Sequence, residues 1–223
     1  MEERFARNIP ALSEAQCALL RGKKAAVIGC GGLGGYLVEL LTRVGIGSIR
    51  VVDGDVFDPS NLNRQILCDM SRLGTGKAAA AVQRALAINP AVKAEGIDTF
   101  LTPENAASLI EGCDVVLDAL DNVPSRRVLA AACDAAGIPC IYGAIQGWVA
   151  QAAVSLPWDG LIERLYPADV EIRDKSVLSF TPALCASLQA ALCVKLLTGQ
   201  DVPAGKILYF DLFDQEFEMI SFN

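Results

Sequence analysis

Apolar and polar positions alternate along this chain in a pattern typical of strands that each lead into a helix. Residues Lys23 to Ile28 form an apolar run that predicts a buried strand, and a glycine turn is expected at 29–35. A helix is predicted at 36–44 and a second strand at 48–52, where the run ends in Asp53. Strand, turn, helix and strand in this order make a βαβ unit with parallel strands.

The same analysis extends to the rest of the chain. A short helix is expected at 13–20, with Ser13 as its N-cap. Further strands are predicted at 92–97, 115–118, 140–144 and 149–156, and further helices at 77–88, 103–110 and 128–136. The run at 115–118 is very apolar, which indicates a central parallel strand.

The last part of the chain has a different pattern. An irregular segment is expected at 157–180, followed by a helix at 181–197 with Thr181 as its cap and Pro182 at its first position. Two strands at 207–211 and 217–222 are predicted to form a hairpin across a turn at Asp214.

Together these elements predict an α/β fold, a Rossmann-like doubly wound and mostly parallel sheet with antiparallel strands at its C-terminal end. The 223 residues suit a single domain, with a nucleotide-binding core at 1–155 and a crossover loop, helix and terminal strands at 156–223. No apolar run reaches the length that spans a bilayer, and the first ten residues lack the apolar core of a signal peptide. We therefore expect a cytoplasmic protein without a membrane partner.

The turn after the first strand carries a G-x-G-x-x-G motif, formed by Gly29, Gly31 and Gly34, with Gly32 between them. Such a turn lets a phosphate approach the unpaired N–H groups of a helix N-terminus. Glycines that only relieved crowding would be costly, because each costs about 1 kcal/mol relative to alanine in a helix. Asp53 stands where an acceptor for a ribose hydroxyl is expected. The motif alone leaves NAD, FAD and ATP open.

Polar residues beyond the second strand narrow the choice of nucleotide. Amides, an arginine, a lysine and carboxylates follow along the chain. A triphosphate with its metal ion needs such a set of side chains, whereas a dehydrogenase has no need of them beside its pyrophosphate. Arg64 follows the carboxyl end of a strand and is expected to contact the β- or γ-phosphate in bidentate fashion. The run before Lys77 is not a Walker A loop, because Ser71 and Ala78 stand at two of its essential positions.

At these residues the chain resembles the ThiF/MoeB/HesA family, relatives of the ubiquitin-activating enzymes. The matching motifs are G-x-G-G-L-G, D-x-D-x-V-x-x-S-N-L-N-R-Q, the lysine that follows, and D-x-x-D-N. The resemblance covers nearly the whole chain, although its specific motifs end at Asn122. It implies one homodimeric adenylyltransferase domain over 1–223. With ATP and Mg²⁺, such an enzyme activates the C-terminal glycine of a ubiquitin-fold sulphur carrier ending in Gly-Gly and releases pyrophosphate.

The resemblance also assigns roles to residues. Arg7, Arg64, Lys77 and Asp121 are the expected catalytic residues, with Arg7 reaching into the nucleotide site of the partner subunit and Asp121 holding magnesium. The expected nucleotide-binding residues are Gly29, Gly31, Gly32, Gly34, Asp53, Asp55, Ser60, Asn61, Asn63, Arg64, Gln65, Lys77, Asp121 and Asn122. One of Asp118 and Asp121 is left open as the cap of the helix that starts near Pro124.

Histidine is absent from the sequence, and none of the eight cysteines forms a C-x-x-C pair. Catalysis by Ser-His-Asp or Cys-His is therefore excluded, and no zinc knuckle is expected. Relatives in the resembling family carry zinc-binding cysteines, and sometimes a transfer thiol, in the crossover, but residues 157–180 contain no cysteine. We expect no zinc, and we interpret Cys185 and Cys193 as core residues, with a part in transfer left open.

The net charge of −7 argues against a nucleic acid partner. The nearer alternative is an enzyme similar to tRNA threonylcarbamoyladenosine dehydratase, which would have to grip RNA, so the acidic balance counts against it. An NAD-binding oxidoreductase and a non-catalytic nucleotide-binding scaffold also remain open, because the glycine motif by itself allows both.

Overall fold

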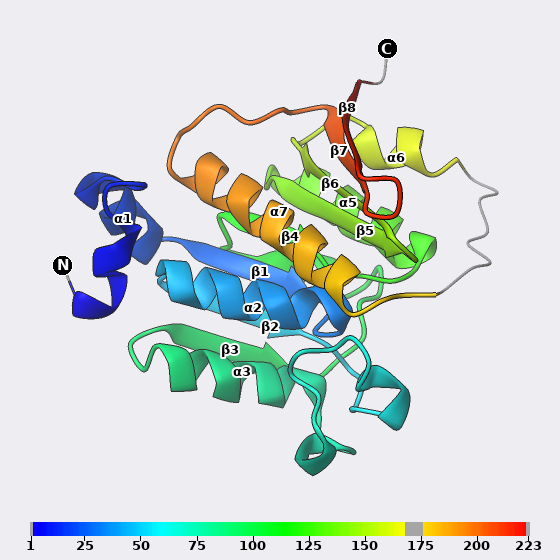
Figure 1. The fold of residues 1–223 in the computed structure, drawn as a ribbon. Coiled ribbons are helices and arrows are strands. Elements are labelled where there is room, and N and C mark those ends of the chain that lie inside the picture. Colours follow the sequence, from blue (N-terminus) through cyan, green and yellow to red (C-terminus); the bar gives the residue numbers. More distant parts are fainter. Residues whose placement is uncertain (1, 168–175, 222–223) are drawn as a thin grey trace.

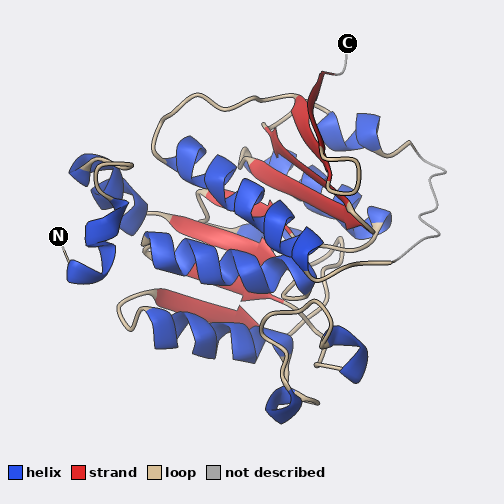
Figure 2. Ribbon diagram, viewed as in Figure 1, coloured by secondary structure: helices blue, strands red, loops and turns tan. Residues whose placement is uncertain are grey.

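A computed structural model describes residues 2–167 and 176–221, which form an eight-stranded sheet with helices on both faces (Figures 1 and 2). The strand order is β3-β2-β1-β4-β5-β6-β7-β8. This order confirms the predicted doubly wound fold.

Five strands form the parallel half of the sheet: β1 (Lys24–Ile28), β2 (Ser48–Val52), β3 (Lys93–Ile97), β4 (Val115–Asp118) and β5 (Cys140–Gln146). Ile28 at the end of β1 is in register with Val52 of β2 and with Asp118 of β4. The chain winds in opposite directions from β1, so the carboxyl ends of β1 and β4 flank the point at which such sheets bind ligands.

The other three strands, β6 (Val149–Ser155), β7 (Lys206–Asp211) and β8 (Glu216–Ser221), continue the sheet from β5 and are antiparallel. Tyr209 of β7 is in register with Glu218 of β8, as in the hairpin predicted around Asp214. The antiparallel C-terminal extension is therefore confirmed.

One face of the sheet is covered by α2 (Gly32–Val44), α3 (Lys77–Ile88) and α7 (Phe180–Leu197). The other carries α4 (Ala106–Ile110), α5 (Val123–Ala136) and α6 (Leu161–Leu165). The 3-10 helix η1 (Glu3–Asn8) and α1 (Glu14–Arg21) lie beside the amino end of β1 (Figure 1). Two more 3-10 helices, η2 (Pro59–Asn61) and η3 (Met70–Arg72), belong to the loop between β2 and α3.

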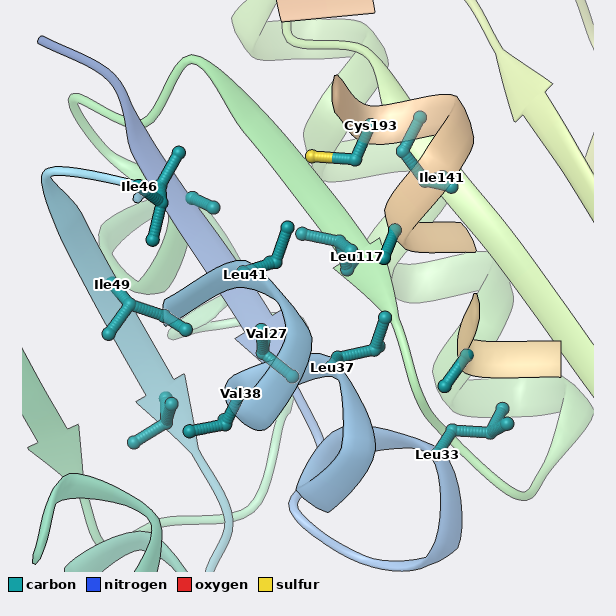
Figure 3. Close-up of a cluster of buried hydrophobic side chains, with 14 of the residues drawn as sticks. Val27, Leu33, Leu37, Val38, Leu41, Ile46, Ile49, Leu117, Ile141 and Cys193 are labelled. Atoms are coloured by element: carbon teal, nitrogen blue, oxygen red, sulfur yellow. The ribbon is translucent and has the colours of Figure 1, made fainter. Parts of the chain in front are cut away.

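The main core lies between the sheet and the face formed by α2, α3 and α7. Leu37 and Leu41 of α2 are fully buried near Val27 of β1 and Leu117 of β4, and Cys193 of α7 lies beside them (Figure 3). A fully buried side chain of this size contributes about 1.5–3 kcal/mol. This packing fixes the start of α2, and with it the glycine turn, against the carboxyl ends of β1 and β4.

Several helix starts differ from those predicted. α2 begins at Gly32, four residues early, because the apolar spacing that buries Leu33 and Leu37 outweighs the poor helix propensity of glycine. α7 begins at Phe180, so Thr181 lies inside the helix and is not its cap; its hydroxyl donates to the carbonyl of Gly147 at 2.7 Å. The helix expected at 103–110 is shortened to α4. α5 begins at Val123, close to the start expected near Pro124, so it is longer than the predicted span 128–136.

The segment expected to be irregular contains α6, which buries Leu161 and Ile162 against α5. Residues 168–175 of that segment lie outside the described residues. Gly160, at a positive φ of 64°, precedes this short helix. Its five residues are too few for the periodic pattern that predicts helices.

One expectation about membranes needs correction. α7 has 18 residues with a mean hydropathy of 1.5, so by length and composition it is able to cross a bilayer. Half of it is buried inside the protein, and it packs against α2, β5 and β6. A helix that is apolar on all sides and enclosed in this way is a core helix.

Candidate functional site

A cavity with a volume of about 380 Å³ opens at the carboxyl ends of β1, β2 and β4. Its walls come from the glycine turn, the segment after β2, the start of α3, the loop after β3, the loop after β4 and the end of β5. Such a position is the ligand-binding crevice of a doubly wound sheet, and ligand pockets are typically about 300–1,000 Å³ in volume.

The glycine turn lines this cavity with Gly29, Gly31 and Gly32. Gly29 has φ +97°, and a Cβ there would lie 2.6 Å from the carbonyl oxygen of Ala119 in the neighbouring loop. Only glycine fits both the backbone conformation and the close approach. Gly31 is the N-cap of α2, and the first residues of this helix line the cavity. The unpaired N–H groups of the first helical turn therefore lie in the cavity wall.

Gly34 is buried behind the turn and is not among the residues that line the cavity. A Cβ on Gly34 would lie 1.8 Å from the carbonyl oxygen of Gly29. Its role in this structure is to let α2 pack closely on the glycine turn.

Asp53 is half-buried at the end of β2 and lines the cavity. Its Oδ2 accepts from the Cys30 N–H at 2.7 Å, and its Oδ1 accepts from the Asp55 N–H at 2.9 Å. Burial raises the pKa of Asp53, although these two N–H groups oppose the shift. A carboxylate has about four acceptor sites, so it can still accept from the hydroxyls of a ribose.

Lys77 and Asp55 lie together on the cavity wall. Lys77 opens α3 and is only 5% exposed, and its Nζ lies 2.5 Å from Oδ2 of Asp55. The backbone N–H of Lys77 donates to the carbonyl of Asp55 at 3.0 Å. The hydrogen bond from Lys77 lowers the pKa of Asp55, so the pair is ionic.

Arg64 and Gln65 line the cavity beside the glycine turn. Nη1 of Arg64 donates to the carbonyl of Ser60 at 2.9 Å and to Oδ1 of Asn63 at 2.8 Å. Gln65 is buried next to Gly31, and its Oε1 has no hydrogen-bond partner within residues 2–167 and 176–221. A buried amide oxygen without a partner costs about 1–3 kcal/mol, so this wall is suited to a bound molecule that donates to it.

Ser60, Asn61 and Asn63 do not line the cavity. The backbone carbonyl of Asn61 accepts from the N–H groups of Arg64 and Gln65, and its side-chain Oδ1 accepts from the N–H of Asp58, the N-cap of η2. Nδ2 of Asn63 donates to the carbonyl of Val177 at 3.1 Å. In this structure these three residues shape the loop that carries Arg64 and Gln65.

Asp121 and Asn122 are both exposed and line the cavity in the loop after β4. Oδ1 of Asn122 accepts from the Ser125 N–H at 2.9 Å, so Asn122 is the N-cap of α5. The expectation that Asp118 or Asp121 caps this helix is therefore wrong. Nδ2 of Asn122 donates to Asp121 at 3.2 Å, and the carboxylate of Asp121 is available to a ligand.

A buried ion pair, Asp118–Arg126, lies under this loop and was missed by the sequence reasoning. Nη1 of Arg126 lies 2.7 Å from Oδ2 of Asp118, and both side chains are at most 5% exposed. Burial opposes the charge of Arg126, but the Asp118 carboxylate outweighs it and raises the arginine pKa. A signal was present in the sequence, because Arg126 occupies a position on the buried face of α5 together with Val123, Leu129 and Cys133.

Arg7 is exposed in η1, which lies beside the amino end of β1 (Figure 1), whereas the cavity opens at the carboxyl ends of the strands. η1 is held there because Phe5 packs against Gly45 and Asn8 donates to the carbonyl of Val44. Arg7 does not line the cavity of its own chain. Its role in the site of a partner subunit stays a prediction.

All eight cysteines are described, and all are buried. Burial raises the pKa of Cys185 to about 12, and that of Cys193 likewise to about 12. Sγ of Cys185 donates to the carbonyl of Gln151 at 3.2 Å. Among the residues that the structure describes, no group of three or more acidic or cysteine side chains is arranged to hold a metal ion.

Comparisons with known proteins agree with this geometry. The model of the ThiF family matches residues 5–223. The chain is 34% identical over 212 residues to a SAMP-activating enzyme E1 of Haloferax volcanii, a match that covers 92% of this chain and 78% of the relative. It is also 34% identical over 215 residues to a sulfur carrier protein adenylyltransferase of Thermus thermophilus, covering 91% of this chain and 79% of that protein.

A similar fold occurs in the E. coli tRNA N6-threonylcarbamoyladenosine dehydratase, solved in complex with ATP, with a TM-score of 0.75 and 24% identity. The match covers 88% of this chain and 94% of the dehydratase chain. At this identity the likeness concerns the fold alone.

Proposed function

The chain belongs to the ThiF family, and on that premise we propose that it is an ATP-dependent adenylyltransferase. Its proposed substrate is the C-terminal glycine carboxylate of a ubiquitin-fold sulphur carrier protein that ends in Gly-Gly. The names of two relatives at 34% identity, a SAMP-activating enzyme and a sulfur carrier protein adenylyltransferase, support this assignment.

The observation that carries the proposal is the convergence of cationic and anionic side chains on one cavity beside a glycine turn. Arg64 and Lys77 supply positive charge, and Asp53 and Asp121 supply carboxylates. These groups fit the three parts of MgATP, namely its ribose, its phosphates and its metal ion.

The lining suggests how the nucleotide is oriented. Asp53 would accept from the ribose hydroxyls, and the N–H groups at Gly31 and Gly32 would face the phosphates. The loop after β3 lines the cavity on the side of Asp53 with Phe100 and Leu101, whose apolar surfaces suit the adenine base.

In the proposed reaction, the carrier's terminal carboxylate attacks the α-phosphorus of ATP. A new carboxylate-oxygen-to-phosphorus bond forms, the bond between the α-phosphorus and its bridging oxygen breaks, and pyrophosphate leaves. The attacking carboxylate is already ionised at neutral pH, so a general base is unnecessary. Catalysis would then consist of positioning and of neutralising charge on the pyrophosphate, a role that we assign to Arg64 and Lys77 because both line the cavity.

Mg²⁺ fits the carboxylate of Asp121. Magnesium is commonly held by one or two protein carboxylates together with substrate phosphates, so a cage made only of protein ligands is unnecessary. When bound, the ion would supply positive charge to the phosphate oxygens. Asp121 is the residue that would hold it, because its carboxylate is exposed in the cavity.

The proposal includes a homodimer, in which Arg7 of each subunit reaches the nucleotide site of the other and adds a third positive charge there. Arg7 is exposed and carries its charge away from its own cavity, which is compatible with a role across an interface. The proposed location is the cytoplasm, where ATP is abundant.

The decisive experiment is carrier-dependent exchange between ATP and pyrophosphate. The purified protein should catalyse exchange when MgATP and a ubiquitin-fold carrier ending in Gly-Gly are both present. The same carrier without its last glycine is the matched control and should support no exchange. Calorimetry that showed no binding of MgATP but tight binding of NAD would overturn the proposal in favour of an oxidoreductase.

A further inference from the structure

The peptide unit of Leu120, directly before Asp121, is held on both sides by one buried ion pair. Oδ1 of Asp118 accepts from the Leu120 N–H at 2.9 Å, and Nη2 of Arg126 donates to the Leu120 carbonyl. Asp118 and Arg126 are joined to each other at 2.7 Å. The loop therefore leaves β4 in a fixed direction.

Arg126 is itself held rigidly. Its Nη1 also donates to the carbonyl of Gly143 in β5 at 2.8 Å, and its guanidinium lies 5.1 Å from the ring centre of Tyr142 and 6.0 Å from that of Tyr166. A planar guanidinium with three acceptors and two aromatic rings around it has little freedom to reorient. Only arginine presents several donors in such a fixed fork.

Further hydrogen bonds fix both ends of the loop between β4 and α5. Asn122 caps α5 through the Ser125 N–H at 2.9 Å, and Gln189 of α7 donates to the carbonyl of Asp118 at 2.8 Å and to that of Ile141 at 3.0 Å. Between these anchors, the carboxylate of Asp121 is the charged group that the loop presents to the cavity.

Stability alone is a weak reason for this arrangement. Burying two charges costs several kcal/mol of desolvation per ion, and well-packed apolar side chains often serve stability as well or better. The pair does, however, hold Leu120, the residue before Asp121. Mg²⁺ requires its ligands in near-ideal geometry, so the direction of the Asp121 carboxylate would matter for binding the ion.

We propose that Asp118 and Arg126 are positioning residues, which fix the Leu120 peptide and thereby aim Asp121 at the metal-bound phosphates of the nucleotide. This inference rests on the proposed function. It assigns a purpose to a buried pair of which Arg126 lines the cavity and Asp118 does not. Residues that orient a metal ligand in this way typically contribute about 10–100-fold to metal affinity or activity.

The test compares the binding of ATP by calorimetry with Mg²⁺ and with a chelator, so that the effect of the metal is measured without turnover. In Arg126→Lys we expect affinity for MgATP to fall by about 10–100-fold. The affinity of this variant for ATP without Mg²⁺ should stay within about twofold of the wild-type affinity, because effects at independent sites usually agree to about that factor. Arg50→Lys is the matched control, because Arg50 pairs with Glu95, donates to the carbonyls of Leu109 and Glu111 and does not line the cavity; it should leave both affinities unchanged.

Coupling to Asp121 separates positioning from mere stability. In an Asp121→Ala background, Arg126→Lys should cause no further loss of MgATP affinity, because the group that it positions is already gone. If the losses of MgATP affinity in the two single variants simply added in the double variant, the inference would be overturned. An equal fall in the affinity of Arg126→Lys for ATP with and without Mg²⁺ would overturn it as well.

Asp118→Asn provides a second variant if Arg126→Lys unfolds. Its amide keeps the volume and can still accept from the Leu120 N–H, but it no longer pairs ionically with Arg126, so the same metal-specific loss is expected. An Asp118→Asn protein that melts normally and keeps wild-type MgATP affinity would refute the positioning role. Wild-type protein that fails to bind MgATP would instead refute the proposed function, and the inference with it.

Discussion

Nζ of Lys77 lies 2.5 Å from Oδ2 of Asp55, so the lysine that was predicted to bind phosphate already has an anionic partner in its own chain. The lysine is almost fully buried, whereas the side chain of Asp55 is 54% exposed. A buried ammonium needs a nearby negative charge. Asp55 supplies that charge in the absence of nucleotide, and a phosphate group would share or replace it.

This relationship predicts an unusual response of Asp55→Asn. Without nucleotide the variant should lose about 1 kcal/mol of unfolding free energy, a modest value because Asp55 is largely exposed. MgATP would restore the missing negative charge beside Lys77, so the rise in Tm on adding MgATP should be larger than in the wild type. Thermal unfolding with and without MgATP measures both effects.

Asp69→Asn is the control for that measurement, since Asp69 caps η3 and pairs with Arg72 rather than with Lys77. It should show the wild-type rise in Tm. A rise in Asp55→Asn that is equal to or smaller than in the wild type would show that phosphate does not meet Lys77.

Asp121→Ala tests the assignment of the metal ligand. Asp121 is exposed, so we expect an unchanged Tm, but a fall in pyrophosphate exchange of about 100-fold or more. Glu163→Ala removes an exposed carboxylate of α6 that does not line the cavity, and this variant should exchange normally. Exchange retained in Asp121→Ala would remove this residue from the mechanism.

Arg7→Ala tests the action of one subunit on the other. By analogy with arginine fingers in phosphoryl transfer, exchange should fall by up to about 10³-fold. Mixed dimers of Arg7→Ala and Asp121→Ala subunits should regain one working site, because one of the two sites then receives both an intact Asp121 and an intact Arg7. If mixing restored no activity, Arg7 would not act across the interface.

Phe100 provides a test of where the base lies. Its side chain is 65% exposed at the cavity, and a Cβ on Gly54, next to Asp53, would lie 2.9 Å from its ring. Stacking of a base on an aromatic ring contributes about 1–3 kcal/mol. Phe100→Ala should therefore raise the KM for ATP about tenfold or more at unchanged kcat. Phe213→Ala, at an equally exposed ring in the β7–β8 turn, should change neither constant.

The cysteines lead to a prediction about the product. With a pKa of about 12, Cys185 and Cys193 gain thiolate only as the pH approaches that value. Iodoacetamide at about pH 8 should therefore leave exchange intact in the folded protein, while denatured protein is labelled freely. Intact-mass analysis should show carrier adenylate and no thioester between carrier and enzyme. A reductant-sensitive adduct with the carrier would show that a thiol of this chain takes over the acyl group.

Sequence patterns predicted the strands well, because buried parallel strands are continuous apolar runs and the terminal hairpin alternates in period two. They also pointed to Gly29, Asp53 and Lys77, which the structure brings to the wall of one cavity because they lie in turns or at the ends of strands and helices; their roles stay predictions. The start of α2 was missed, because the tertiary packing of Leu33 and Leu37 outweighs the low helix propensity of the glycines.

The role of Arg126 was not predictable from local pattern alone, because its acceptors come from three places in the chain, namely Asp118, Leu120 and Gly143. The pairing of Lys77 with Asp55 is likewise a tertiary contact across 22 residues. Among the predicted site residues, Ser60, Asn61 and Asn63 were placed correctly in the loop, but the structure directs their hydrogen bonds to the protein.

The position of α7 has a consequence for how this protein unfolds. The helix packs against β5 and β6, and it also packs against α2, the helix that follows the glycine turn. Residues on both sides of position 155 therefore belong to one buried cluster, and we expect the two sides to lose their structure together. Melting should be a single cooperative transition, and the change from parallel to antiparallel strands marks no seam along which the molecule comes apart.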